Sequence, residues 1–344
     1  MREVEIGQGV VSGGGRPFVL VAGPCVIESE DLTLRVAGRL KEIARSLDVP
    51  LVFKASYDKA NRTSRQSFRG PGLEKGLEIL DRVKREFALP VLSDVHRFEE
   101  IRAASEVLDV VQVPAFLCRQ TDFLQEVARN ARVVNIKKGQ FVAPWDGGMI
   151  LDKAAAAGNA NVVITERGYT FGYNNLVADM RSLPILRKTG YPVIFDATHS
   201  VQLPGGTGTA SGGDREMAVF LARAAVAAGV DGLFFEVHPD PDRALCDGPN
   251  SLELERVPEL LRLLRKIDDI VKEEAGNNGR GNGKRDAGNR RFRRSQGADT
   301  PREPLRHRRG RRPHRRADHH GRRRAGDQAF SRPGRPRSEA PPAG

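Results

Sequence analysis

The sequence predicts an α/β fold, a closed (β/α)8 barrel, and three observations carry this prediction. Short β-branched apolar runs alternate with longer segments whose apolar residues recur at helical spacing. Their apolar residues are continuous rather than alternating, which indicates strands buried on both faces and therefore a parallel sheet. Eight strand–helix units in roughly 250 residues fit a closed barrel. An open doubly wound sheet is the alternative, although no glycine fingerprint follows the first strand.

The predicted elements follow in order along the chain. The eight strands cover residues 18–22, 50–55, 90–95, 110–114, 133–137, 162–166, 192–196 and 232–237. The first helix places Leu32, Leu40 and Leu47 on one face, with Ser29 or Asp31 as its cap. Similar apolar stripes predict helices over 73–87, 121–128 and 260–271. The segment 3–15, rich in Gly and Val, predicts a short hairpin across the bottom of the barrel.

Charge divides the chain into two parts. Residues 276–344 contain 21 Lys and Arg against 6 Asp and Glu, which leaves 35 basic and 38 acidic residues before them. The net charge of +12 therefore belongs to this last segment. Its few large apolar residues cannot bury enough surface to offset chain entropy. We predict a catalytic barrel domain over 1–275 and a disordered basic tail over 276–344.

The cysteines and the hydropathy pattern bear on the compartment. The three cysteines show no paired spacing, and the charged N-terminus does not read as a secretory segment. No run approaches the ~20 apolar residues of a membrane span. We expect a soluble cytoplasmic protein.

Polar or reactive residues stand where each predicted strand ends, the edge at which barrel enzymes carry their chemistry. The cations among these residues and the loops after them are Lys54, Lys59, Arg62, Lys137, Lys138 and Arg167. Gathering them at one rim of a nearly neutral domain should cost repulsion that only bound anions offset. The predicted ligands therefore carry phosphate or carboxylate groups.

Cys25, at the exit of the first strand, allows several roles. His199 and Glu236 stand at the ends of strands seven and eight, and Asp247 lies in the following loop. Because strands one and eight are neighbours in a closed barrel, these four side chains form a candidate metal site. The alternatives are a buried core thiol with structural polar neighbours, or a nucleophile that uses His199 as its base.

The motifs at the strand ends resemble those of the 3-deoxy-D-manno-octulosonate-8-phosphate synthase family. The resemblance covers about residues 16–274. It rests on segments 22–25 (AGPC), 54–64 (KASYDKANRTS), 93–96 (SDVH), 112–122 (QVPAFLCRQTD), 135–141 (NIKKGQF), 165–168 (TERG), 171–175 (FGYNN), 195–199 (FDATH) and 236–239 (EVHP). It implies a transferase of lipopolysaccharide sugar biosynthesis that condenses phosphoenolpyruvate with D-arabinose 5-phosphate and water, in a cytoplasmic homotetramer.

The resemblance also assigns roles to individual residues. For phosphoenolpyruvate it implies Lys54 and Ser56 at the carboxylate, and Gln112, the Ala115 backbone, Lys137 and Arg167 at the phosphate. For arabinose 5-phosphate it implies Lys59, Asn61 and Asp94 along the chain, and Arg62 and Thr63 at the phosphate. Arg119 would reach that phosphate from a neighbouring subunit.

With a cysteine at position 25, the sequence resembles the metal-dependent branch of this family. The resemblance implies a divalent ion, Zn, Fe, Mn or Co, bound by Cys25, His199, Glu236 and Asp247. The candidate catalytic residues are Cys25, Lys59, Asn61, His199 and Asp247.

Two alternative functions remain open at this point. One is the sister reaction on erythrose 4-phosphate, although the Lys-Ala-Asn-Arg segment at 59–62 favours arabinose 5-phosphate. The other concerns the tail alone: its arginines could bind nucleic acid without reading sequence. Aromatic stacking residues are scarce there, and the same composition arises when a GC-rich reading frame is translated out of register.

Overall fold

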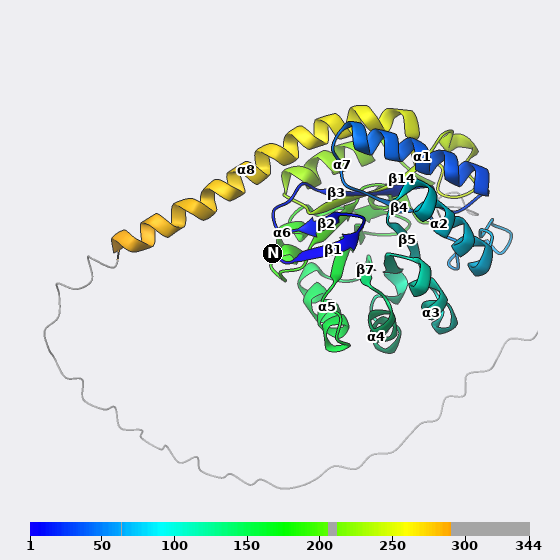
Figure 1. Ribbon diagram of the computed structural model, residues 1–344, viewed down its shortest axis with the longest axis horizontal. Helices are drawn as coiled ribbons and strands as arrows, with labels where there is room; N and C mark the ends of the chain where they lie inside the picture. The colour runs from blue at the N-terminus through cyan, green and yellow to red at the C-terminus, as the bar shows by residue number, and fades with distance from the viewer. Residues whose placement is uncertain (63, 206–211, 290–344) are drawn as a thin grey trace, which may run out of the picture. The chain divides into compact units, whose positions relative to one another are not determined.

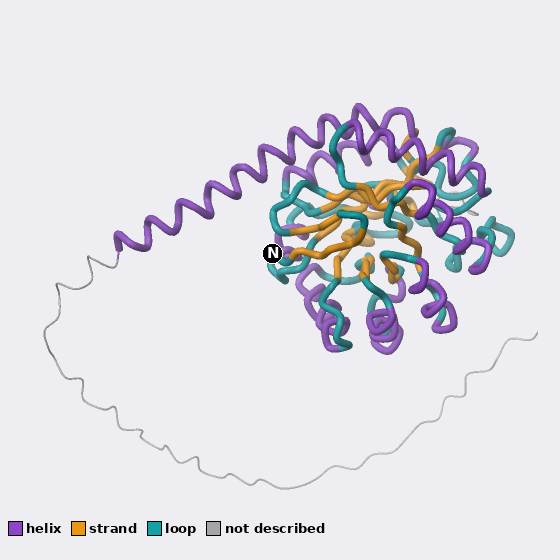
Figure 2. The backbone as a smooth tube through the Cα atoms, in the orientation of Figure 1, coloured by secondary structure: helices purple, strands orange, loops and turns teal. Residues whose placement is uncertain are grey.

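In the computed structural model, which describes residues 1–62, 64–205 and 212–289, eight parallel strands close into a barrel (Figures 1 and 2). The closure is made where β11 pairs with both β8 and β14, and where β14 pairs with β3. In chain order the barrel strands are β3 (Val19–Gly23), β4 (Leu51–Lys54), β5 (Val91–Asp94), β6 (Val110–Val113), β7 (Val133–Lys137), β8 (Val162–Glu166), β11 (Val193–Asp196) and β14 (Gly232–His238). The predicted barrel is confirmed.

Helices surround the strands, as Figure 2 shows by colour. They are α1 (Glu30–Ser46), α2 (Leu73–Phe87), α3 (Phe98–Val107), α4 (Thr121–Asn130), α5 (Gly147–Ala156), α6 (Ser182–Arg187), α7 (Arg215–Ala227) and α8 (Val257–Asn289). Ser29 caps α1 as predicted, because its hydroxyl accepts a hydrogen bond from the backbone N–H of Leu32 at 3.2 Å. The short ladders β9 (Tyr169–Thr170) with β10 (Leu176–Val177), and β12 (Gln202–Leu203) with β13 (Gly212–Gly213), belong to loops.

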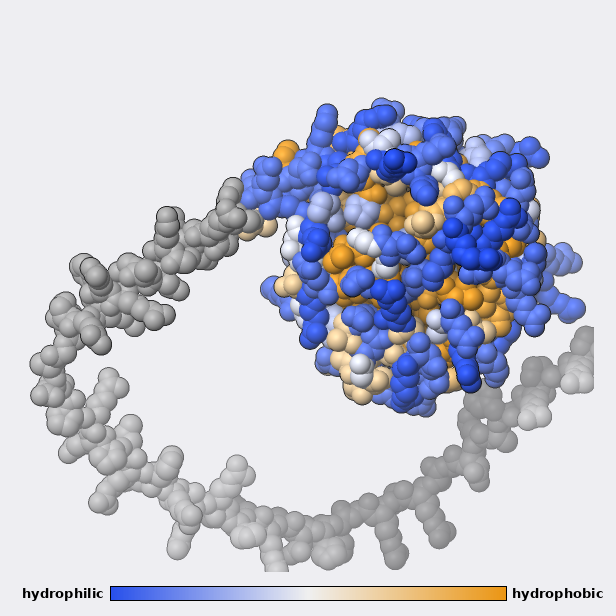
Figure 3. All heavy atoms as spheres, in the orientation of Figure 1, coloured by the Kyte–Doolittle hydropathy of each residue, from blue (hydrophilic) through white to orange (hydrophobic). Residues whose placement is uncertain are grey.

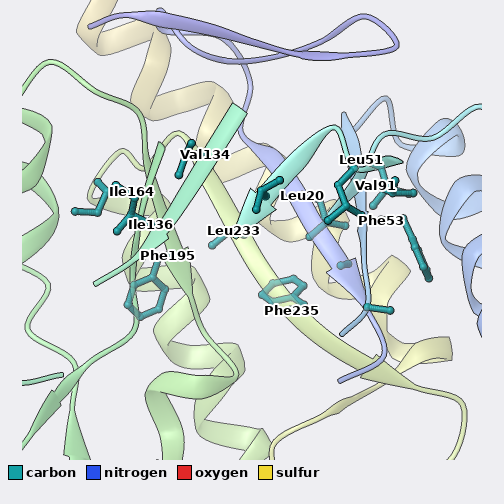
Figure 4. Packing of buried hydrophobic residues seen from close by; sticks show 14 of the residues in the cluster. Leu20, Leu51, Phe53, Val91, Val134, Ile136, Ile164, Phe195, Leu233 and Phe235 are labelled. Carbon is teal, nitrogen blue, oxygen red and sulfur yellow. The ribbon is translucent and has the colours of Figure 1, made fainter. Parts of the chain in front are cut away.

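The two faces of each strand bury different residues because side chains alternate along a strand. Outward residues such as Leu20, Phe53 and Phe235 pack in one cluster with the helices (Figure 4). Inward residues near the strand starts form a second apolar cluster inside the barrel, among them Val52 and Phe234. Two residues further along, the same inward face becomes polar. These polar positions are Lys54, Asp94, Gln112, Asn135, Lys137, Thr165, Asp196 and Glu236.

An N-terminal hairpin closes the end of the barrel where the strands begin. It consists of β1 (Glu3–Gly7) and β2 (Val10–Gly13), which pair antiparallel (Figure 1). Val4, Ile6 and Val10 belong to the same apolar cluster as the inward residues of the barrel strands. This confirms the predicted cap and leaves the other end, where the strands finish, for the chemistry.

The surface and the C-terminal region complete the description. Hydrophilic residues cover most of the face drawn in Figure 3, with apolar residues showing between them nearer its centre. Within the described ranges, no helix combines the length and hydrophobicity that crossing a membrane requires. The chain divides into two units, Met1–Arg291 and Phe292–Gly344. Helix α8 continues to Asn289, past the predicted domain end at 275, and most of the predicted tail lies outside the described residues.

Candidate active site

A cleft of about 540 Å³ opens where the barrel strands end. Eleven of the predicted site residues line it: Lys54, Lys59, Asn61, Arg62, Asp94, Gln112, Ala115, Lys137, Arg167, His199 and Asp247. Three others lie in direct contact with lining residues: Cys25 with Asp247, Ser56 with Asp94 and Glu236 with Lys54. Arg119 is exposed and does not line the cleft of its own chain, and Thr63 lies outside the described residues.

The loop after β3 brings Cys25 beside β4. Gly23 allows the two strands to approach, because a Cβ atom there would overlap the carbonyl oxygen of Lys54. Beyond the strands, Val26 and Ser56 still form a parallel bridge. The carbonyl oxygen of Cys25 accepts a hydrogen bond from Lys54 Nζ at 2.9 Å. The cysteine is therefore held in place beside the cleft, in contact with its lining residue Asp247.

Lys54 and Glu236 form a buried ion pair from strands on either side of β3. Lys54 Nζ lies 2.8 Å from Glu236 Oε1, and both side chains are almost inaccessible to solvent. Lys59 Nζ approaches the same oxygen at 3.7 Å. Burial alone would raise the pKa of the Glu236 carboxyl, but the charges of His199, Lys54 and Lys59 outweigh it and hold this pKa well below its ordinary value. Glu236 is thus ionised in the cleft.

A second buried group links β7 with β11. Lys137 Nζ and His199 Nδ1 lie 2.6 Å and 2.7 Å from Asp196 Oδ2, respectively. Burial opposes ionisation of Asp196, yet His199 and Lys137 hold its pKa well below the ordinary range. Because Nδ1 of His199 faces the Asp196 carboxylate, the other ring nitrogen, Nε2, faces the candidate metal ligands Glu236 and Asp247.

The four predicted metal ligands form a continuous chain of contacts. Cys25 Sγ lies 3.5 Å from Asp247 Oδ2, which lies 3.8 Å from His199 Nε2, and that nitrogen lies 3.4 Å from Glu236 Oε1. Ligand atoms bound at ordinary zinc distances in a tetrahedron stand about 3.3 to 3.8 Å apart.

A buried carboxylate oxygen of Glu236 also suits a metal site. Glu236 Oε2 is buried and has no hydrogen-bond partner among the described residues. The residues present therefore suit a divalent cation with sulfur, nitrogen and oxygen donors.

Asp94 carries a separate hydrogen-bond network on the opposite wall. It accepts a hydrogen bond from Ser56 Oγ at 2.5 Å and pairs with His96 Nε2 at 3.0 Å. Glu100 accepts from the backbone N–H of His96 and from the Tyr57 hydroxyl. Burial lowers the pKa of His96, but the hydrogen bonds to Asp94 and Glu100 outweigh burial and raise it to about 9. His96 is thus a cation that fixes Asp94 at the edge of the cleft.

Two predictions about the cations are corrected. Lys138 does not join the cluster, since its ammonium group pairs with Glu166 at 3.4 Å and lies over the Tyr169 ring. Lys137 and Lys138 are consecutive and therefore point to opposite faces. The prediction that only bound anions offset the repulsion is also wrong, because buried Glu236 and Asp196 face Lys54 and Lys137.

Arg167 is the cation that retains unbalanced charge. Its guanidinium donates to Gln202 Oε1 at 2.8 Å, and no described carboxylate lies within salt-bridge distance of it. Sequence reasoning missed Gln202, which lies in a loop without a distinctive motif. It also missed Cys246, because no spacing pattern in the sequence predicts its contact with Cys25.

The fold and the cleft together define a (β/α)8 barrel enzyme whose cleft is lined by several cations and by groups that could hold a metal ion. The sequence matches the DAHP synthetase I family over residues 2–273. It is 62% identical over 272 residues to a 2-dehydro-3-deoxyphosphooctonate aldolase of Geotalea daltonii, covering 79% of this chain and 100% of that relative.

Two further relatives with the same name give similar figures. The chain is 62% identical over 271 residues to the protein of Geobacter sulfurreducens and 59% identical over 271 residues to that of Trichlorobacter lovleyi. Each match covers 79% of this chain and 99% of the relative. The chain belongs to the DAHP synthetase I family.

Proposed function

We infer that the protein condenses phosphoenolpyruvate with D-arabinose 5-phosphate and water, giving 3-deoxy-D-manno-octulosonate 8-phosphate and inorganic phosphate. This is the synthesis of the compound after which its relatives are named, a sugar acid of lipopolysaccharide. The observation that carries the inference is one cleft combining buried cations with a cysteine-containing ligand cluster, in a chain 62% identical to those relatives. None of these relatives favours the alternative reaction on erythrose 4-phosphate.

Phosphoenolpyruvate would occupy the deeper part of the cleft. Lys54 and Ser56 would hold its carboxylate, while Gln112, the Ala115 backbone, Lys137 and Arg167 would hold its phosphate. Arg167 supports this placement because it is buried and no carboxylate among the described residues pairs with it, so a bound phosphate would supply the compensating charge. Gln112 is oriented for the task, since its Oε1 accepts a hydrogen bond from Asn135 Nδ2 at 2.9 Å.

Arabinose 5-phosphate would lie nearer the opening of the cleft. Lys59, Asn61 and Asp94 would contact its chain, and Arg62, with Thr63 beside it in sequence, would hold its phosphate. The Asp94 carboxylate is suited to accept hydrogen bonds from sugar hydroxyls, because His96 and Ser56 already fix its orientation. These roles are those that the resemblance implies, and Lys59, Asn61, Arg62 and Asp94 all line the cleft.

The reaction joins two anions, and the protein's main task is to bring them together. The C2–C3 π electrons of phosphoenolpyruvate form the new bond from C3 to the aldehyde carbon of arabinose 5-phosphate. The aldehyde oxygen gains a proton. Water adds at C2, and the C2–O bond to phosphate then breaks, which releases inorganic phosphate and leaves the ketone. Lys54, Lys137 and Arg167 would offset the negative charge that repels the second substrate.

The metal site is part of the proposal. Cys25, His199, Glu236 and Asp247 would hold a divalent ion, such as Zn²⁺, Fe²⁺, Mn²⁺ or Co²⁺, which would supply Lewis-acid polarisation when bound. Asp196 would keep His199 in the orientation that directs Nε2 to this site. Lys59, whose ammonium group lies 3.7 Å from Glu236 Oε1, would stand between the site and the sugar.

The assembly is a further proposed feature. Arg119 is exposed outside its own cleft, so a contact with the sugar phosphate would have to come from a neighbouring subunit. The exposed apolar side chains Phe116, Phe141, Trp145 and Met149 follow strands β6 and β7 and would suit an interface between copies. We propose a homotetramer. Its free cysteines fit the reducing cytoplasm.

A phosphate-release assay tests the reaction and the metal together. The full chain should release phosphate from phosphoenolpyruvate with arabinose 5-phosphate and far less with erythrose 4-phosphate. A chelator should abolish turnover, and added Zn²⁺, Mn²⁺ or Co²⁺ should restore it. Cys25→Ala should lose the response to added metal, whereas Cys118→Ala, at a buried cysteine outside the cleft, should keep it. Full turnover after metal removal would refute the metal role, and preference for erythrose 4-phosphate would refute the substrate.

A further inference from the structure

We propose that Cys246 is a second thiolate ligand of the metal centre, beside Cys25. This inference rests on the proposed metal site and adds a donor to the four ligands already described. It also makes a statement about the ion, because a second soft sulfur donor favours metals such as Zn²⁺ over Mn²⁺.

The two thiols meet inside the protein although they are far apart in sequence. Cys246 Sγ lies 2.6 Å from Cys25 Sγ, and each side chain is 4% exposed. Cys25, Cys246 and Asp247 offer three ligand atoms that all lie within 4.8 Å of one another. His199, Glu236 and Asp247 form a second such group. Asp247 therefore joins the two groups into one five-residue cluster.

The backbone of the loop after β14 is shaped to present two consecutive side chains to one point. In an extended chain, residues 246 and 247 would point in opposite directions. Asp247 instead adopts a left-handed conformation with φ of +49°, which is uncommon for a residue other than glycine. Its carbonyl oxygen accepts hydrogen bonds from the backbone N–H groups of Asn250 and Ser251. A strained backbone conformation of this kind persists only where the surrounding structure holds it, and such conformations are common at ligand-binding sites.

The start of the same loop is also fixed. The backbone N–H of Leu245 donates a hydrogen bond to Glu28 Oε1 at 2.9 Å. Glu28 stands three residues after Cys25, so this bond joins the loop that carries Cys246 to the loop that carries Cys25. The contact between the thiols is thus held from both sides.

The charges around the cluster suit an additional anionic sulfur. Arg62 Nη1 lies 2.9 Å from Cys246 Sγ and 3.9 Å from Asp247 Oδ1. A guanidinium there compensates the negative charge of a second thiolate. Independently of the cysteines, Glu236 Oε2 is fully buried in the adjoining group and has no hydrogen-bond partner in the part of the chain that the structure describes. That oxygen is therefore available as a ligand atom.

The geometry requires only a local adjustment. Two sulfurs bound to one zinc ion at ordinary bond lengths stand about 3.8 Å apart, so the present contact would open by about 1.2 Å. A side-chain rotation at either cysteine can supply such a change.

Spectroscopy of the Co²⁺-loaded full chain, kept under reducing conditions, tests the proposal directly. The near-ultraviolet charge-transfer band of thiolate bound to Co²⁺ grows with the number of sulfur ligands. We expect Cys246→Ser and Cys25→Ser each to retain about half of the wild-type intensity per bound Co²⁺. Cys118→Ser, at the third buried cysteine, is the matched control and should retain all of it.

X-ray absorption of the Zn²⁺-loaded wild type provides a measurement that needs no variant. We expect two sulfur neighbours per zinc at about 2.3 Å. A single sulfur neighbour overturns the proposal, as does a charge-transfer band that Cys246→Ser leaves intact and Cys25→Ser abolishes. If the wild type binds Co²⁺ through one sulfur only, Cys246 is not a ligand, but the four-ligand site proposed above still holds. If the wild type binds neither Co²⁺ nor Zn²⁺, both the second thiolate and the four-ligand site are refuted.

Discussion

Lys54→Met offers a sharp test of how the cleft is held together. The substitution keeps most of the side-chain volume but removes the charge that lies 2.8 Å from Glu236 Oε1. Removing one partner of a buried ion pair costs about 3 to 5 kcal/mol, because the other charge stays buried with less compensation. For a domain of this size, each kcal/mol corresponds to a shift of about 2 to 4 °C in Tm. The Tm should therefore fall by roughly 6 to 20 °C.

The matched control is Lys138→Met. Lys138 is equally buried and pairs with Glu166 at 3.4 Å, but it lies outside the cleft. Both variants should lose stability, as followed by thermal unfolding. Below the lower Tm, only Lys54→Met should lose kcat/KM for phosphoenolpyruvate, by about 100-fold or more, since it removes a cation at developing charge. Equal losses of activity in the two variants would contradict the assigned role of Lys54, and an unchanged Tm would contradict the buried-pair argument.

Three further predictions address the network, the hairpin and the tail. The raised pKa of His96 contributes stability that is fully present below about pH 6.5. That contribution is lost as pH rises through about 9, so His96→Gln should flatten this part of a urea-denaturation pH profile, and an unchanged slope would refute the argument. Ile6→Ala should cost about 2 to 5 kcal/mol of unfolding free energy with kcat unchanged, unlike exposed Glu5→Ala; no loss would mean that the hairpin is not part of the core. Deleting 290–344 should leave turnover intact but abolish salt-sensitive retention on a polyanion column, and reduced turnover would give the tail a catalytic role.

The barrel was predictable because its signals are local. The predicted strands 133–137 and 162–166 coincide with β7 and β8, because each begins with consecutive apolar residues that are buried on both faces. Helix α1 was equally predictable from its stripe of apolar residues and from Ser29 as its N-cap. Much of the cleft followed from the fold alone, because parallel strands bring their carboxyl ends together.

The remaining details depend on side-chain direction and loop path. Lys138 was misplaced because a strand end was treated as a single point, whereas alternation separates it from Lys137. Counting alternate residues from the apolar interior of the barrel would have corrected this. The contact between Cys246 and Cys25 depends on the left-handed conformation of Asp247. A sequence does not clearly show which non-glycine residue adopts that conformation.

The hairpin β1–β2 closes one end of the barrel, so among the described residues the cleft opens at the other end. Val4 and Ile6 fill the far end, so reactants and products must use the same passage. A ligand whose anionic groups reach Lys54 and Lys137 would have to enter before a partner held nearer the mouth by Arg62. Under the proposed placement of the substrates, phosphoenolpyruvate would bind first, and the product, which carries a carboxylate and a phosphate, would have to leave before the next cycle.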